Sequence, residues 1–159
     1  MVSSRQNWPY LEVTGYLIPT LLEAQEHDLA YQYAEFLCYM QRANGSFAGS
    51  DGREYLFDSG QALRGLIRAS LYWPQFKPFA QKTADYILSS MEDSGRLPGI
   101  YNDDIPEAVH VFILPGLAET SKLLNDFRYL NATQKALNFY KHSPEILNRK
   151  CLTHFLAYI

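Results

Sequence analysis

The feature that most constrains this chain is a segment that recurs at intervals of about 45 to 50 residues. Its clearest copy is residues 57–69, FDSGQALRGLIRA. Related copies lie 45 positions earlier, around residues 14–21, and 51 positions later, around residues 109–117. A fourth start, residues 153–159, resembles residues 109–113 at a shift of 44. Self-similarity at this period is typical of helical-repeat proteins, in which each repeat buries its apolar face against its neighbours.

Each copy contains two amphipathic helical patterns, because apolar residues recur with the 3.6-residue period of a helix. The second helices of the first two copies match at a shift of 50 positions, which pairs Ala30 with Ala80, Ala34 with Ala84, and Leu37 with Ile87. No segment alternates well enough to indicate a strand. We therefore expect an all-α single domain of αα-hairpins, over residues 14–45, 58–95 and 104–142, with the start of a fourth over 151–159.

Several helix boundaries follow from local signals. Pro19 falls inside the first apolar pattern, and we expect one helix bent at Pro19 rather than a helix that starts there. Pro115 occupies the equivalent place in the third copy and predicts a second bend. Asp28 is the expected N-cap of the second helix. The last helix is expected to start at Asn131 and to run to about residue 142.

Composition favours a globular protein and excludes some functions. The hydrophobic fraction is 47% and the charged fraction 19%, values that suit a folded domain. The net charge of −3 and the lack of a basic cluster argue against nucleic-acid binding. Cys38 and Cys151 lie in apolar helical patterns, which indicates reduced thiols. With no signal peptide or membrane span, we expect a cytoplasmic protein that does not enter a membrane.

The repeat resembles that of α/α-toroid proteins. The resemblance rests on Gln41-Arg42-Ala43-Asn44-Gly45-Ser46-Phe47 at the end of the second helix, followed by Phe57-Asp58-Ser59-Gly60-Gln61. Toroid proteins include six-hairpin glycosidases, polysaccharide lyases and epimerases. The spacing of Gln41, Gly45 and Phe47 is also similar to the glutamine-aromatic repeat of terpenoid cyclases, although their aspartate-rich motif is not matched. A ring of six hairpins needs about 270 residues. We therefore expect part of an (α/α)6 toroid. Either the chain is a fragment of a ring, or it forms an open half-ring that caps its own edge or pairs with a second copy.

The resemblance implies a carbohydrate ligand and a set of candidate residues near the starts of the first helices. The catalytic candidates are Asp58, Glu12 and His110. Glu107 would lie on the same rim as Asp58 and Glu12, and His154 on the wall of the cleft. The candidates for substrate binding are Tyr16, Gln61, Arg64, Tyr101 and Asp103. Two carboxyl groups, such as Asp58 with Glu12, Asp103 or Asp104, would serve glycoside hydrolysis. A lyase or epimerase would instead use His110 or a tyrosine as base, with Arg64 on a uronate carboxylate.

Each candidate also has a structural interpretation. The spacing of Asp58 and Gln61 is that of a helix capping box, and the same holds for Asp104 and Glu107. Arg64 would pair with a nearby carboxylate, and His110 would pack in an apolar helix. In that case the protein is a non-enzymatic interaction module or a toroid remnant without chemistry. No cofactor is expected, and no spacing of His, Cys, Asp and Glu suggests a metal site.

Overall fold

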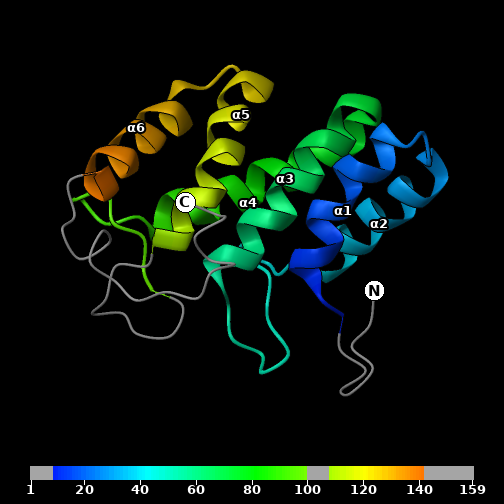
Figure 1. The fold of residues 1–159 in the computed structure, drawn as a ribbon, viewed down its shortest axis with the longest axis horizontal. Helices are drawn as coiled ribbons and strands as arrows, with labels where there is room; N and C mark the ends of the chain where they lie inside the picture. The colour runs from blue at the N-terminus through cyan, green and yellow to red at the C-terminus, as the bar shows by residue number, and fades with distance from the viewer. Residues whose placement is uncertain (1–8, 100–107, 142–159) are drawn as a thin grey trace.

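The computed structural model describes residues 9–99 and 108–141, which form two layers of helices (Figure 1). Apart from isolated bridge positions at Pro9 and between Ala48 and Glu54, these residues contain no β structure, so the expected all-α class is confirmed. The elements in chain order are α1 (Leu11–Glu23), α2 (His27–Met40), α3 (Leu56–Tyr72), the 3-10 helix η1 (Pro74–Phe76), α4 (Lys77–Ser90), the 3-10 helix η2 (Ala108–Ile113), α5 (Leu114–Leu124) and α6 (Phe127–Lys141).

The odd-numbered helices form one layer, in which α3 packs between α1 and α5. Each even-numbered helix packs against the odd-numbered helix before it. Helices α1 and α3 are parallel, because Gly15 lies beside Gln61 and Ile18 lies beside Gly65, so the contacts advance together along both helices. Closure of these layers into a ring stays a prediction.

Glycines set the separation of α1 and α3. A Cβ atom on Gly15 would collide with the backbone carbonyl of Gln61, and one on Gly65 would lie 2.5 Å from the carbonyl oxygen of Gly15. Pro19 lies inside α1, as expected from the sequence, and has no N–H to donate to that same Gly15 carbonyl. Helix α3 therefore approaches α1 closely at the Gly15 carbonyl, which receives no helical hydrogen bond from residue 19.

Two predictions about Pro115 and Asn131 are wrong. Pro115 lies in the first turn of α5, where a missing N–H costs nothing, and the turns before it are 3-10 rather than α. The last helix begins at Phe127, four residues before Asn131. Asn125 is left-handed, with a φ of 54°, and the Asp126 carboxylate accepts a hydrogen bond from the Arg128 amide at 3.0 Å. This turn ends α5 and starts α6 at once.

The predicted caps at Asp28 and Asp58 are also wrong. Helix α2 begins at His27, so Asp28 lies in its first turn and caps nothing. Helix α3 begins at Leu56, two residues before Asp58, and its N-cap residue is Tyr55. The Asp58–Gln61 capping box therefore does not form. An acidic residue in a first turn still meets the positive end of the helix dipole.

The loops that follow α2 and α4 share one backbone conformation. In the first loop, the Gly45 amide donates to the Arg42 carbonyl at 2.9 Å, and the Arg42 amide donates to the Ser46 carbonyl at 3.0 Å. Fifty positions later, the amides of Gly95 and Glu92 make the equivalent bonds, both at 2.9 Å. Gly45 and Gly95 have φ angles of 93° and 91°. The sequence match at a shift of 50 therefore corresponds to a match in local structure.

Both loops pack against the next even-numbered helix. A Cβ atom on Gly45 would meet the backbone of Lys82 in α4, and one on Gly95 would meet that of Lys135 in α6. Gln41 adds a side-chain link to α4: its amide donates to the Phe79 carbonyl at 2.9 Å and to the Thr83 hydroxyl at 2.7 Å. Fully buried apolar side chains close each loop over the core, Phe47 in the first and Leu97 in the second.

Aromatic side chains fill the seams between helices at the opposite end of the layers. Tyr31 of α2 packs edge-on against Trp73, with ring centroids 5.2 Å apart and planes at 79°. Trp73 in turn contacts the buried ring of Phe76. These aromatic residues serve helix packing.

Candidate functional site

The candidate site lies at the end of the layers where α1 and α3 begin and where the loops 41–55 and 91–99 are found; we call this the loop end. Glu12 is in the first turn of α1, and Asp58 is in the first turn of α3. Because the two helices are parallel and in register, the two half-buried carboxyl groups meet and form a hydrogen bond. The predicted pairing of Glu12 with Asp58 therefore exists in the structure.

Asp58 is the member of this pair that holds a proton. Burial raises the pKa of Asp58 to about 7, and the charge and hydrogen bond of Glu12 and the charge of Asp51 add to the effect. Burial also raises the pKa of Glu12, but the hydrogen bond from Asp58 lowers it. The Asp58 carboxyl group donates and the Glu12 carboxylate accepts, so the pair carries one proton at a pH just below 7.

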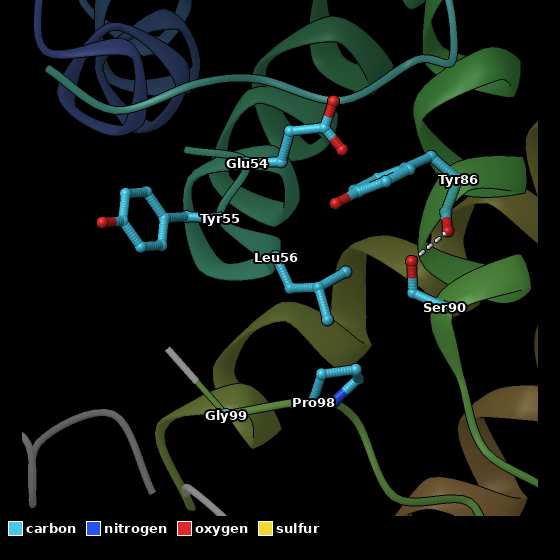
Figure 2. Close-up of a pocket in the computed structure, with 7 residues that line it drawn as sticks. All are labelled: Glu54, Tyr55, Leu56, Tyr86, Ser90, Pro98 and Gly99. Carbon is cyan, nitrogen blue, oxygen red and sulfur yellow. Dashed lines mark hydrogen bonds between the residues drawn. The ribbon is translucent and has the colours of Figure 1, made fainter. Parts of the chain in front are cut away.

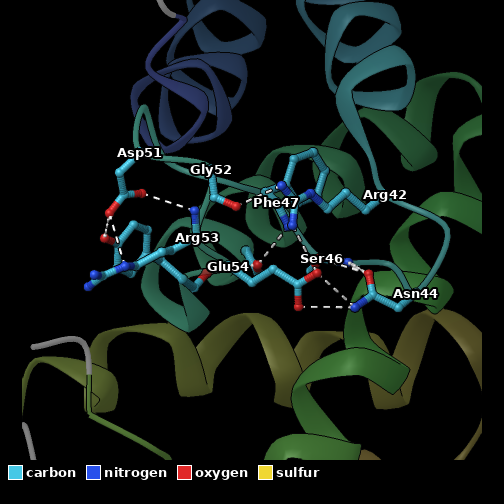
Figure 3. Close-up of polar contacts among 10 residues, drawn as sticks. Arg42, Asn44, Ser46, Phe47, Asp51, Gly52, Arg53 and Glu54 are labelled. Atoms are coloured by element: carbon cyan, nitrogen blue, oxygen red, sulfur yellow. Dashed lines mark hydrogen bonds and ion pairs between the residues drawn. The ribbon is translucent and has the colours of Figure 1, made fainter. Parts of the chain in front are cut away.

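Asp51 supplies an ionised carboxylate close to this pair, and sequence reasoning missed it. Asp51 accepts a hydrogen bond from the Tyr55 hydroxyl at 2.6 Å. It accepts another from the Arg53 amide at 3.0 Å (Figure 3). These bonds lower the pKa of Asp51. Asp51-Gly52 is a turn signal that could have placed the residue at a loop tip, but its proximity to Asp58 depends on how the loop folds back.

Three predicted ligand contacts differ in their accessibility. Tyr16 lies one turn after Glu12 on α1, with 38% of its surface exposed. Gln61 is only 1% exposed, and its Oε1 atom accepts no hydrogen bond within the described residues. The guanidinium of Arg64 is exposed and lies 5.7 Å from the centroid of the Phe112 ring. Tyr16 and Arg64 can therefore meet a ligand directly, whereas Gln61 cannot without a rearrangement.

Of the remaining predicted residues, the structure describes only His110, which does not join the pair. His110 is fully buried in η2, where a ligand at the surface does not reach it. The other candidates lie outside the described residues, namely Tyr101, Asp103, Asp104, Glu107 and His154.

A pocket of about 160 Å³ opens at the loop end between the two loops (Figure 2). Its walls are both polar and apolar, with Glu54, Tyr55, Leu56, Tyr86, Ser90, Pro98 and Gly99. Burial and then the negative charge of Glu54 raise the pKa of Tyr86, so its phenol stays protonated and able to donate. The apolar period of the sequence does not predict this pocket, because the residues that line it come from three separate segments of the chain.

Glu54 is held in place by its own neighbours. Its carboxylate accepts hydrogen bonds from Arg42 at 3.2 Å and from Asn44 at 3.1 Å (Figure 3). Burial raises the pKa of Glu54, but hydrogen bonds from Ser46, Asn44 and Arg42 outweigh that effect, so the pKa is lowered. The pocket therefore has one fixed negative charge beside a neutral phenol and two apolar side chains.

Within residues 9–99 and 108–141, no three side chains of His, Cys, Asp or Glu come together as a metal site. None of the helices in this part of the chain combines the length and the apolar character that crossing a membrane requires. Comparisons of the chain with protein-family models, with curated proteins and with solved structures find no match.

Proposed function

We propose that this protein binds and processes a carbohydrate at the loop end, with Asp58 as the general acid. The observation that carries the proposal is the Glu12–Asp58 pair, whose half-buried Asp58 has a pKa of about 7. A carboxyl group that keeps its proton near neutral pH is what a general acid needs, and such groups cluster at functional sites. The amphipathic pocket beside Tyr86 would suit a sugar, which also has polar and apolar faces.

Glycoside hydrolysis is the reaction that this arrangement supports best. It requires two carboxyl groups about 5–5.5 Å or about 6.5–9.5 Å apart, one protonated and one ionised. Glu12 and Asp58 are hydrogen-bonded to each other and hence closer than either range, so we treat them as one proton donor. Asp51, which is ionised and near Asp58, would then be the base or nucleophile.

The proposal is tested by comparing Asp58→Asn with the wild type on a panel of neutral and uronate polysaccharides. Release of reducing ends measures hydrolysis, and ultraviolet absorbance of unsaturated products measures elimination. We expect wild-type hydrolysis of one class, and a loss of about 10²- to 10⁴-fold in turnover in the variant.

Asp28→Asn is the matched control, because Asp28 is an exposed aspartate in the first turn of α2, at the far end of the layers. It should keep wild-type turnover. Equal turnover in Asp58→Asn and the wild type would remove Asp58 as the acid. Absence of both turnover and binding across the panel would remove the carbohydrate proposal.

A non-enzymatic role is the second candidate, and the Glu12–Asp58 pair supports it as well. The carboxyl–carboxylate hydrogen bond links the start of α1 to the start of α3. In this second role the bond joins two repeats of an interaction module. On this account Asp58→Asn changes stability and leaves every activity of the protein unaltered.

A further inference from the structure

We propose that Arg64 and Arg68 form an anion-binding site on α3 that takes the carboxylate groups of an acidic saccharide. This inference rests on the proposed function, because it names the class of carbohydrate. Both side chains are exposed, and they lie one helical turn apart. Residues four positions apart are neighbours on a helix surface, so the two side chains leave α3 on the same side.

These two arginines differ from the other arginines in the described part of the chain. Each of the other four forms an ion pair with a carboxylate, namely Arg42 with Glu54, Arg53 with Asp51, Arg96 with Glu92 and Arg128 with Asp126. No ion pair joins Arg64 or Arg68 to any described residue. Two like charges at this spacing destabilise a helix. An anion bound between them would remove that repulsion.

The guanidinium of Arg64 is oriented by aromatic rings. It lies 5.7 Å from the centroid of Phe112, and the Phe112 ring stacks on Phe57 with centroids 6.4 Å apart and planes at 25°. A guanidinium above an aromatic face keeps the N–H groups at its own edge available, and these can form bidentate hydrogen bonds with a carboxylate. Arg64 is thus partly preorganised for a planar anion.

The position of the arginines connects them to the carboxyl pair. Arg64 and Arg68 follow Asp58 on the same helix by six and ten residues, or roughly 9 and 15 Å along the axis. A ligand of about 15 Å that lies along α3 would therefore span the axial distance from the acid to both arginines. Exposed Tyr16 of α1 lies on the flanking helix, one turn after Glu12.

The surrounding charges favour a saccharide over a nucleic acid. Glu12, Asp58 and Asp51 lie at the loop end of the same helix pair, and the whole chain has a net charge of −3. A phosphate backbone and a uronate chain each carry about one negative charge per unit, but a phosphodiester offers only hydrogen-bond acceptors. Each uronate unit also has hydroxyl groups, which can donate hydrogen bonds to these carboxylates.

Isothermal titration calorimetry tests the site with four probes: a galacturonate oligosaccharide, its methyl ester, inorganic sulfate and a single-stranded oligonucleotide. We expect the wild type to bind the galacturonate oligosaccharide at least tenfold more tightly than the ester. Arg64→Gln and Arg68→Gln should each reduce that affinity about tenfold and leave the affinity for the ester unchanged. Lys77→Gln removes one exposed positive charge from α4 and should change neither affinity.

Several results would overturn the inference. One is equal affinity for the acid and the ester, and another is no binding of the acid at millimolar concentration. Sulfate or the oligonucleotide binding as tightly as the oligosaccharide would assign the arginines to a different anion. Unfolding curves of both variants must match the wild type, so that a loss of affinity is not a loss of structure.

The anion site and the proposed reaction can fail separately. If the acid binds through Arg64 and Arg68 but no substrate is turned over, the reaction is wrong and the anion site stands. If turnover depends on Asp58 and both arginine variants keep wild-type affinity and rate on acidic substrates, the anion site is wrong and the reaction stands.

Discussion

Asp58 keeps its proton near neutral pH because it is partly buried beside a second carboxyl group. Desolvation penalises the charged form, and a negative Glu12 penalises it further. The positive end of the α3 dipole acts in the opposite direction but is worth at most about 2 kcal/mol, even at a partly buried site. Burial and the neighbouring charge therefore decide the protonation state, as they do at many acid–base sites.

This shift predicts a pH dependence of stability. The pKa of an unfolded aspartate is about 3.9, and that of folded Asp58 is about 7. Between these values the folded state binds more protons than the unfolded state, so Asp58 makes the free energy of unfolding fall as the pH rises from about 4 to 7. Asp58→Asn should reduce this fall and should be more stable than the wild type above pH 7. Urea unfolding between pH 4 and 8 measures both quantities.

Asp28→Asn is the control for this experiment as well, because it changes the same residue type in an exposed first turn. Its stability should follow the wild-type pH profile. A constant difference in stability between Asp58→Asn and the wild type at every pH would show that Asp58 titrates normally in the folded protein.

At the scale of the helix, the contact between α1 and α3 depends on positions without a side chain. Gly15 and Gly65 face each other's helices, and a Cβ atom on either would meet backbone atoms that cannot rotate away. The same contact brings the first turns together and so sets the separation of Glu12 and Asp58. Structure at the candidate site is thus coupled to packing one to two turns further along both helices.

Gly15→Ala and Gly65→Ala should each destabilise the protein by about 1–3 kcal/mol, the usual cost of overpacking. This cost exceeds the gain of up to about 1 kcal/mol that alanine brings to a helix interior. Chemical denaturation measures the change. Either variant should also separate the carboxyl pair and lower the pKa of Asp58, which carboxyl NMR titration would detect.

Gly116→Ala is the matched control on α5. The nearest atoms to a Cβ at this position are 3.9 Å away, an ordinary van der Waals distance. Gly116→Ala should therefore be neutral or slightly stabilising. A loss of stability in Gly116→Ala as large as that in Gly15→Ala would mean that close packing does not explain the glycines.

For the molecule as a whole, the two equivalent loops join each pair of helices to the next. Gly45 and Gly95 combine a left-handed backbone with close contact to the following even-numbered helix. Alanine at either position should cost about 1–2 kcal/mol for the backbone strain and about 1–3 kcal/mol more for the contact. Thermal and urea unfolding of Gly45→Ala and Gly95→Ala should show similar losses.

Gly52 separates these two contributions. Its φ is 79°, but a Cβ atom there would have no neighbour within 4 Å. Gly52→Ala should therefore lose only the strain contribution. Equal losses in Gly52→Ala and Gly45→Ala would indicate that the loops do not rely on packing against α4 and α6.

Some of the candidate site could be predicted from sequence, and the rest could not. Glu12 and Asp58 were predictable as a pair because the repeat places both near the starts of successive first helices. Asp51 and the pocket beside Tyr86 were not, because their proximity depends on loop conformation. The capping box at Asp58 was wrong because two residues within a helix, three positions apart, have the same spacing as a capping box.

The sequence by itself determined the helices, since the 3.6-residue apolar period and the glycine loops are local properties that neighbouring residues impose on the backbone. It also determined that successive units resemble each other. Only the tertiary structure decided the register of α1 against α3, and with it the meeting of two carboxyl groups. Register depends on contacts between residues some 46 positions apart, such as Gly15 with Gln61, and desolvation of Asp58 exists only once those contacts have formed.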